Sequence, residues 1–239
     1  MKRAVAFLTP FGRAATPNDT TLAWFPVVGA LIGGAVGGLW WLAAKIWVAL
    51  LAGAVAVAVD LILTGLLHFD GLADAGDGLL APLTRDRRLA AMSDPSIGAF
   101  GALTVAAVLL LRFGAFATIR PTPLAVAGLW CASRTSMVAI TELLPYVRAE
   151  GLVRGFLGTR SVWQHRVLRG SVVGGVALSV ALVMVARGWR GLIALGAELA
   201  AIALVALFSH RQLGGYTGDV LGAAGVIGET IGLLALAVK

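Results

Sequence analysis

Three aspartates stand close together in a chain that contains few acids. Asp70, Asp74 and Asp77 fall within eight residues, although the 239 residues include only twelve Asp and Glu. On a continuous α-helix, at about 100° per residue, the three carboxylates would project from one face within an arc of about 60°. Like charges placed so closely repel one another, and a divalent cation between them relieves that repulsion. The pattern therefore favours a metal site, with a solvated acidic face as the alternative.

The chemistry of these side chains also indicates which metal they would hold. Carboxylate oxygens with no cysteine nearby favour a hard cation, Mg²⁺ or Mn²⁺. Mg²⁺ usually binds to one or two carboxylates and completes its coordination with water and substrate phosphates. The sequence therefore predicts Mg²⁺ as the cofactor and phosphoryl transfer as the class of reaction.

Two further polar islands each precede an apolar stretch. The first, residues 92–101, contains Asp94, which either binds a ligand or caps the following helix. The second, residues 213–222, contains Asp219, which is either a further metal ligand or an N-cap. Its glycines would let the backbone approach a phosphate at the start of the next helix.

Two basic residues are interpreted with both a functional and a structural alternative. His68 precedes the aspartate cluster, but on a continuous helix it points about 200° away from Asp70. Arg134 lies within an apolar stretch, where an arginine must meet a carboxylate, a phosphate or water. Its partner would be a substrate phosphate or a structural acid, Glu198 or Glu229.

The rest of the composition is that of a membrane protein. Hydrophobic residues make up 59% of the chain and charged residues 13%, with a mean hydropathy of +0.92. Soluble domains are about a quarter charged. A span needs about 20 mostly apolar residues, and seven stretches qualify. They are Leu22–Ala44, Ile46–Leu67, Ile97–Ile119, Pro123–Leu144, Ser171–Ala186, Gly191–Ser209 and Val220–Val238.

We therefore predict an all-α, polytopic membrane bundle that forms a single domain over residues 1–239. About seven transmembrane helices are expected. The fifth stretch is short and only Lys45 separates the first two, so six and eight are the alternatives. The polar stretch Ala149–Gly170 is expected to be a loop with a short amphipathic piece.

The net charge of +7 is explained by membrane topology. Most Lys and Arg fall in the loops that seven spans place on the side of the N-terminus, which identifies that side as cytoplasmic. His68–Asp94 and His210–Asp219 then share the cytoplasmic face. The basic residues are dispersed without interleaved aromatics, so the sequence predicts no nucleic-acid partner. The expected partners are the lipid bilayer, small-molecule substrates and, as an alternative to a monomer, a second copy of the chain.

Several blocks, in order along nearly the whole chain, resemble the cobalamin synthase family, the adenosylcobinamide-GDP ribazoletransferases. They are Phe7-Leu8-Thr9, FPVVG (25–29), LHFDGLADAGDG (67–78), MSDPSIGAFG (92–101), Ser133-Arg134, PYVR (145–148) and LGGYTGDVLGA (213–223). Phe69 and Ala75 stand where the family's motif has Leu and Thr.

The resemblance implies a Mg²⁺-dependent enzyme of the bacterial inner membrane, with its active site facing the cytoplasm. Such an enzyme joins α-ribazole, or its 5′-phosphate, to adenosylcobinamide-GDP and releases GMP. Carried onto this chain, it makes Asp70, Asp74 and Asp77 the metal ligands. Asp74, Asp94 and Asp219 are the candidate catalytic residues, as base or further ligand. The candidate substrate-binding residues are His68, Arg134, Arg148, Gly215, Thr217 and Gly218.

Two other functions are weighed against this one. A CDP-alcohol phosphotransferase also uses aspartates and Mg²⁺, but its Asp-Gly motif is followed by Ala-Arg and by widely spaced acids, which this chain lacks. A transporter would use acids within the spans, such as Asp60, Glu198 and Glu229. The richest acid cluster, however, lies at the end of a span.

Overall fold

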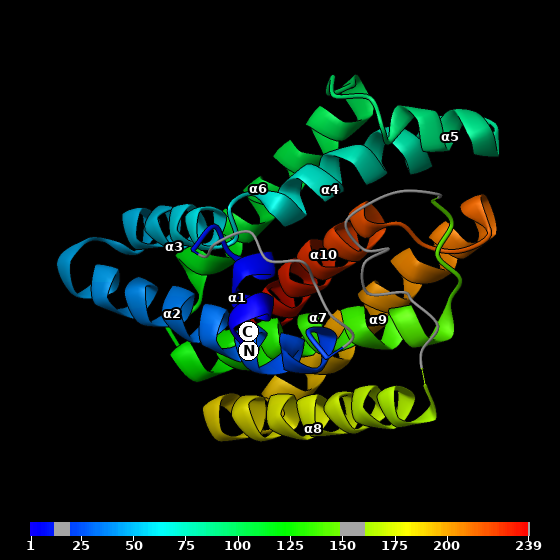
Figure 1. Ribbon diagram of the computed structural model, residues 1–239. Coiled ribbons are helices and arrows are strands. Elements are labelled where there is room, and N and C mark those ends of the chain that lie inside the picture. The colour runs from blue at the N-terminus through cyan, green and yellow to red at the C-terminus, as the bar shows by residue number, and fades with distance from the viewer. Residues whose placement is uncertain (12–19, 149–160, 239) are drawn as a thin grey trace.

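The structure is a computed structural model, and it describes residues 1–11, 20–148 and 161–238 (Figure 1). Within these ranges the ordered elements are all helices, and no strand forms. The bounds are α1 Lys2–Leu8, η1 Leu22–Trp24, α2 Phe25–Ile46, α3 Ala49–Leu63, α4 Leu67–Ala75, η2 Gly76–Leu80, α5 Arg85–Ala91, α6 Ala99–Thr118, α7 Pro123–Leu143, α8 Val162–Arg187, α9 Trp189–Leu213 and α10 Gly218–Leu236.

Six of these helices are long and apolar enough to cross a membrane: α2, α6, α7, α8, α9 and α10. The pair α3 and α4–η2 passes the same test only together, and its sharp bend makes it either one broken span or a re-entrant loop. The described residues thus contain six candidate spans, or seven with the bent pair. The predicted all-α polytopic fold is confirmed.

The helix α7 lies at the centre of the bundle. It is buried along most of its length, whereas α6 and α8 expose most of theirs. Its most extensive contact is with α2, where glycines let the two backbones meet. A Cβ at Gly33 would lie 2.6 Å from the Val126 carbonyl oxygen, and one at Gly37 would lie 2.7 Å from Pro123 Cα. Small residues at such contacts are typical of membrane helices.

The second predicted span, Ile46–Leu67, is wrong as a continuous helix. The helix α3 ends at Leu63, and the chain bends by 92° before α4 begins at Leu67. Gly65 and Leu66 both have positive φ, at 58° and 62°. Two consecutive left-handed residues cannot continue a right-handed helix. After the bend, α4 packs against α10 and α6.

The fifth predicted span, Ser171–Ala186, is too short. The helix α8 begins at Val162 and runs to Arg187, because Ser161 and Gln164 form a capping box at its start. The polar residues 162–170, predicted as part of a loop, therefore belong to this helix. Residues 149–160, the rest of that predicted loop, lie outside the described residues.

The two polar segments meet at one end of the bundle, as predicted. Arg85 Nε, at the start of α5, donates to the Leu213 carbonyl oxygen at the end of α9 (2.8 Å). The turn between α6 and α7 meets the end of α8 at the opposite end, where Arg187 Nη2 donates to the Arg120 carbonyl oxygen (2.7 Å). We call the first end, which carries α4, α5 and the start of α10, the acidic end.

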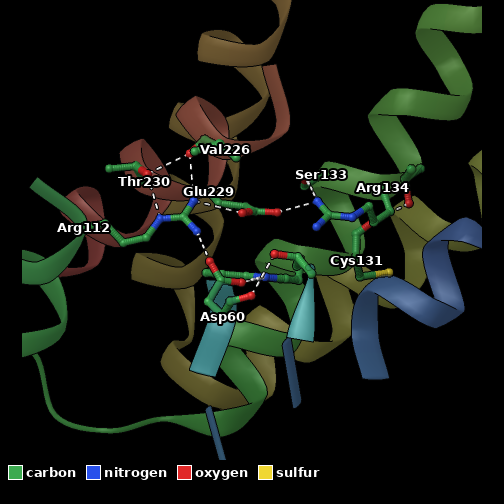
Figure 2. A network of polar contacts seen from close by, with 11 residues as sticks. Asp60, Arg112, Cys131, Ser133, Arg134, Val226, Glu229 and Thr230 are labelled. Carbon is green, nitrogen blue, oxygen red and sulfur yellow. Dashed lines mark hydrogen bonds and ion pairs between the residues drawn. The ribbon is translucent and has the colours of Figure 1, made fainter. Parts of the chain in front are cut away.

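A buried network of charges joins the helices in the interior (Figure 2). Arg112 of α6 is fully buried and pairs with Asp60 of α3 and with Glu229 of α10 (Nη2–Oε2, 2.9 Å). It also donates to Thr230 Oγ1 at 3.0 Å, and Trp130 Nε1 of α7 donates to Asp60 (3.0 Å). Buried charges are stable only when paired and hydrogen-bonded. These contacts therefore fix α3, α6, α7 and α10 relative to one another.

Candidate active site

A cavity of about 300 Å³ opens at the acidic end. Its polar wall is formed by His68, Asp70, Arg148, Gly218 and Asp219. Its remaining wall is mainly apolar and comes from several helices. That wall includes Phe7, Leu8, Phe25, Leu67, Met137, Tyr146 and Leu221. Five residues predicted for the site, from three separate segments of the sequence, are thus brought together.

Glycines in α4 and α10 allow the two acidic segments to approach. A Cβ at Gly71 would lie 2.9 Å from Asp219 Cα, and a Cβ at Gly222 would lie 3.2 Å from His68 Cα. Backbone atoms form both contacts, so a larger residue would push the helices apart. Gly71 therefore places Asp70 of α4 next to Asp219 of α10.

Asp70 and Asp74 occupy successive turns of α4. Asp70 is exposed on the cavity wall, and Asp74 is half-buried one turn further along. Among the described residues, neither carboxylate forms a hydrogen bond or an ion pair. Both are therefore available to a cation or to a substrate proton.

Asp77 departs from the predicted arc, because the helix is not α-helical throughout. From Gly76 to Leu80 it forms a π-helical segment, whose wider turn changes the direction of each side chain. Asp77 accepts hydrogen bonds from the backbone N–H groups of Gly98 (2.7 Å) and Gly101 (2.8 Å). Its carboxylate thus caps α6, and its role as a metal ligand stays a prediction.

Asp94 neither lines the cavity nor caps α6. It is exposed, and its Oδ1 accepts the N–H of Ser96 (2.8 Å). This hydrogen bond lowers the pKa of the Asp94 carboxyl, which makes the carboxylate a weaker base. The cap that the sequence suggested for Asp94 is supplied instead by Asp77, from a different helix.

Thr217, rather than Asp219, is the N-cap of α10. Its Oγ1 accepts the N–H of Val220 (3.3 Å). Asp219 lies in the first turn, where its Oδ2 is 2.9 Å from Arg148 Nη2 and 3.2 Å from Thr217 Oγ1. Asp219 is thus free of the capping role and points its carboxylate toward Arg148.

Arg148 is positioned by a pairing that the sequence did not indicate. After α7 the chain runs beside residues 214–217: Val147 N donates to the Tyr216 carbonyl oxygen (3.1 Å), and Tyr216 N donates to that of Pro145 (2.9 Å). A Cβ at Gly215 would lie 2.0 Å from the Pro145 oxygen. Gly215, predicted to contact substrate, is therefore required for this backbone contact.

His68 and Arg134, both predicted to bind substrate, are buried. His68 lies on the cavity wall, and its Nδ1 has no hydrogen-bond partner among the described residues. Arg134 is absent from the cavity wall. Its Nη1 donates to Glu229 Oε1 (2.5 Å) and to Ser133 Oγ (2.7 Å), as Figure 2 shows. The structural pairing with Glu229 is present, and the phosphate contact stays a prediction.

The family model for cobalamin-5-phosphate synthase matches residues 1–237. The chain belongs to this family. The prediction that it is an enzyme of the cobalamin synthase family is thereby confirmed.

Curated relatives agree with this membership. The adenosylcobinamide-GDP ribazoletransferase of Chlorobium phaeovibrioides is 35% identical over 253 aligned positions, covering 98% of this chain and 95% of its own. That of Chlorobaculum tepidum is 36% identical, covering 95% and 89%. That of Citrobacter koseri is 39% identical, covering 89% and 85%. No solved structure matches the chain.

The donor set fits a cation that arrives with phosphate. Within the described ranges, no three His, Cys, Asp or Glu side chains converge closely enough to hold a metal ion. The cavity nevertheless presents two carboxylates, Asp70 and Asp219, beside the guanidinium of Arg148. One or two carboxylates, completed by substrate phosphates, are the usual protein ligands of Mg²⁺. A cobalamin synthase site of this composition could therefore hold Mg²⁺ once a phosphate substrate is present.

Proposed function

We propose that this protein joins α-ribazole, or its 5′-phosphate, to adenosylcobinamide-GDP, with release of GMP. The single observation that carries the proposal is the cavity at the acidic end, where Asp70, Asp219 and Arg148 meet in a member of the cobalamin synthase family. The names of its relatives supply the substrate, and the cavity supplies groups suited to a pyrophosphate. We place the acidic end in the cytoplasm, because most Lys and Arg lie in loops on that side.

In the proposed reaction, a ribazole hydroxyl oxygen attacks the phosphorus on the cobinamide side of the pyrophosphate. One P–O bond forms, and the bond from that phosphorus to the bridging oxygen breaks, so that the bridging oxygen leaves with GMP. Asp74, half-buried one turn along α4 from Asp70 on the cavity wall, accepts the proton of the attacking hydroxyl in this proposal. Arg148 donates to phosphate oxygens through its planar fork.

Asp70 and Asp219 are the residues that would hold Mg²⁺ in this proposal. When bound, Mg²⁺ would neutralise negative charge on the pyrophosphate during phosphoryl transfer. The apolar wall of the cavity excludes water, which would compete with the ribazole hydroxyl and hydrolyse the substrate.

The experiment is a measurement of GMP release by the purified, detergent-solubilised protein, given both substrates with and without Mg²⁺. We expect release only when all three are present. Asp74→Asn keeps the size of the side chain but loses the base, and it should reduce the rate by a factor of about 10² to 10⁴. Its melting temperature should match that of the wild type.

Asp86→Asn is the matched control, because the Asp86 side chain is 94% exposed and lies outside the cavity. It should release GMP at the wild-type rate. Wild-type protein that gives no GMP would reject the proposed reaction, and an Asp74→Asn variant of near-normal rate would reject the role of Asp74.

A further inference from the structure

The guanidinium of Arg148 makes an unusual pair of contacts. Its Nη2 is 2.9 Å from Asp219 Oδ2 and 2.6 Å from the carbonyl oxygen of Met92. Its Nε is buried and has no hydrogen-bond partner in the described part of the chain. A guanidinium has five N–H donors, so one nitrogen holds Arg148 in place while other donors stay available.

Arg148 is also the cation closest to the acids of the site. Across residues 1–11, 20–148 and 161–238, it alone forms an ion pair with any of Asp70, Asp74, Asp77 or Asp219. The pair is only partly buried, with 22% of the Arg148 side chain and 18% of the Asp219 side chain exposed. It therefore lies at the surface of the cavity, where an incoming ligand can reach both partners.

A second observation indicates that this cavity receives a ligand. His68 is buried and lines the same wall, yet its Nδ1 has no partner. Buried polar atoms in native proteins are almost always hydrogen-bonded. An unpaired ring nitrogen beside Asp70 and Asp219 is therefore consistent with a polar ligand that completes the site.

We propose that Arg148 makes metal binding at Asp70 and Asp219 depend on a phosphate group, because it holds Asp219 until a phosphate oxygen takes the place of that carboxylate. A divalent cation alone must compete with Arg148 for Asp219 and would leave the guanidinium without its anion. A cation that arrives with a phosphate frees Asp219 and gives Arg148 a new anionic partner. The inference rests on the proposed function only in naming phosphate as the replacing group.

The experiment measures the affinity for Mn²⁺ alone, from the electron paramagnetic resonance signal of the free ion, in detergent-solubilised protein without substrate. Arg148→Gln should bind Mn²⁺ at least about fivefold more tightly than the wild type, the lower end of ordinary coupling between ligands. Arg87→Gln is the control, because Arg87 is exposed and pairs with none of the four acids. Its affinity should stay within about twofold of the wild type.

A double-mutant cycle separates the loss of the pair from the loss of a positive charge. If Arg148 acts by holding Asp219, the tighter binding should disappear in Asp219→Asn/Arg148→Gln. If the tighter binding persists in the double variant, Arg148 only screens the acids and the proposal is overturned. It is also overturned if Arg148→Gln binds Mn²⁺ no more tightly than the wild type.

A single substitution keeps the inference testable should Arg148→Gln fail to fold. In the wild type, Asp219 is already engaged, so Asp219→Asn should change the affinity for Mn²⁺ by less than about twofold. Asp70 has no partner, so Asp70→Asn should weaken any measurable binding more strongly. An equal loss in both variants would overturn the proposal. None of these measurements requires turnover, so a failure of the proposed reaction in the GMP assay is distinguishable from a failure of this inference.

Discussion

Arg134 and Arg148 each meet an acid, but their surroundings are different. Arg134 is almost fully buried and pairs with Glu229, which also binds Arg112. Arg148 lies at the cavity, is partly exposed and pairs with Asp219. Because both residues are arginines, the residue type alone did not indicate which one is buried in the bundle and which one lies at the cavity. The depth of each residue and the helix that faces it determine which one can contact a substrate.

Substitution of Arg134 tests its structural role. Arg134→Met leaves one oxygen of buried Glu229 without its partner, and we expect a loss of about 3 kcal/mol, the lower end for a broken buried pair because Arg112 is retained. Arg134→Lys keeps a cation beside Glu229 and should lose less. Melting temperature and GMP release are measured on the same detergent-solubilised samples. A Lys variant with wild-type melting temperature and a rate reduced more than about 100-fold would favour the phosphate contact instead.

At the scale of the elements, the contact between α4 and α10 controls the geometry of the site. Gly71→Ala would place a Cβ 2.9 Å from Asp219 Cα, which is backbone and cannot rotate away. We expect the helices to separate and GMP release to fall at least about tenfold, since a displacement of about 1 Å is costly in catalysis. Gly174→Ala on α8 is the control, because a Cβ there has nothing within 4 Å.

The Gly174→Ala variant should keep its activity and gain up to about 1 kcal/mol, from the higher helix propensity of alanine. Equal rates for the two alanine variants would show that the approach of α4 to α10 is unimportant for turnover. A loss of folding in Gly71→Ala would appear as a lower melting temperature, which separates that effect from misplaced carboxylates.

The cap that Asp77 provides for α6 gives another test at this scale. Asp77→Ala removes the acceptor for the N–H groups of Gly98 and Gly101, and we expect a loss of about 1 kcal/mol. Asp77→Asn keeps one acceptor oxygen and should lose less. The measurement is thermal unfolding in detergent. An unchanged melting temperature combined with a higher Mg²⁺ requirement would instead support Asp77 as a metal ligand.

Most helices could be predicted from the apolar stretches, because a stretch of about 20 apolar residues is long enough to cross a bilayer. The bend after α3 was not predictable in this way, because Leu63-Thr64-Gly65-Leu66-Leu67 continues the apolar run. Leu66 has positive φ, which is uncommon for a residue other than glycine, so neither the hydropathy nor the residue type indicates the turn. The acids themselves were recognisable from their spacing. Their separate roles were not, since Asp77 meets α6 and Asp219 meets Arg148, contacts between residues far apart in sequence.

For the whole molecule, the arrangement of the helices predicts its topology in the membrane. Reporter fusions after Arg88 and after Gly214 should report the same side, because Arg85 and Leu213 are in contact. A fusion after Gly188 should report the opposite side, and we expect the first side to be cytoplasmic. A pair of reporters, one active only in the cytoplasm and one only outside it, gives each position its own control. Opposite sides for Arg88 and Gly214 would contradict the described arrangement.

The buried charge network has a consequence for the order in which the protein is made. Asp60, Arg112 and Arg134 all precede Glu229 in the chain. Glu229, the ion-pair partner of Arg134, belongs to the last helix, α10. An arginine at the centre of a membrane helix costs about 2.5 to 3.5 kcal/mol on insertion scales. The helix that carries Arg134, α7, has the lowest mean hydropathy of the six candidate spans and is also the most buried of them.

A nascent chain that ends before Gly218 therefore carries Arg134 in its central helix without Glu229, the acid with which it forms an ion pair. Until α10 arrives, α7 has to be retained by the insertion machinery or by the helices already made. Completion of synthesis and neutralisation of the interior thus coincide. We expect truncated chains to stay unassembled, which makes them substrates for the proteases that clear incomplete membrane proteins.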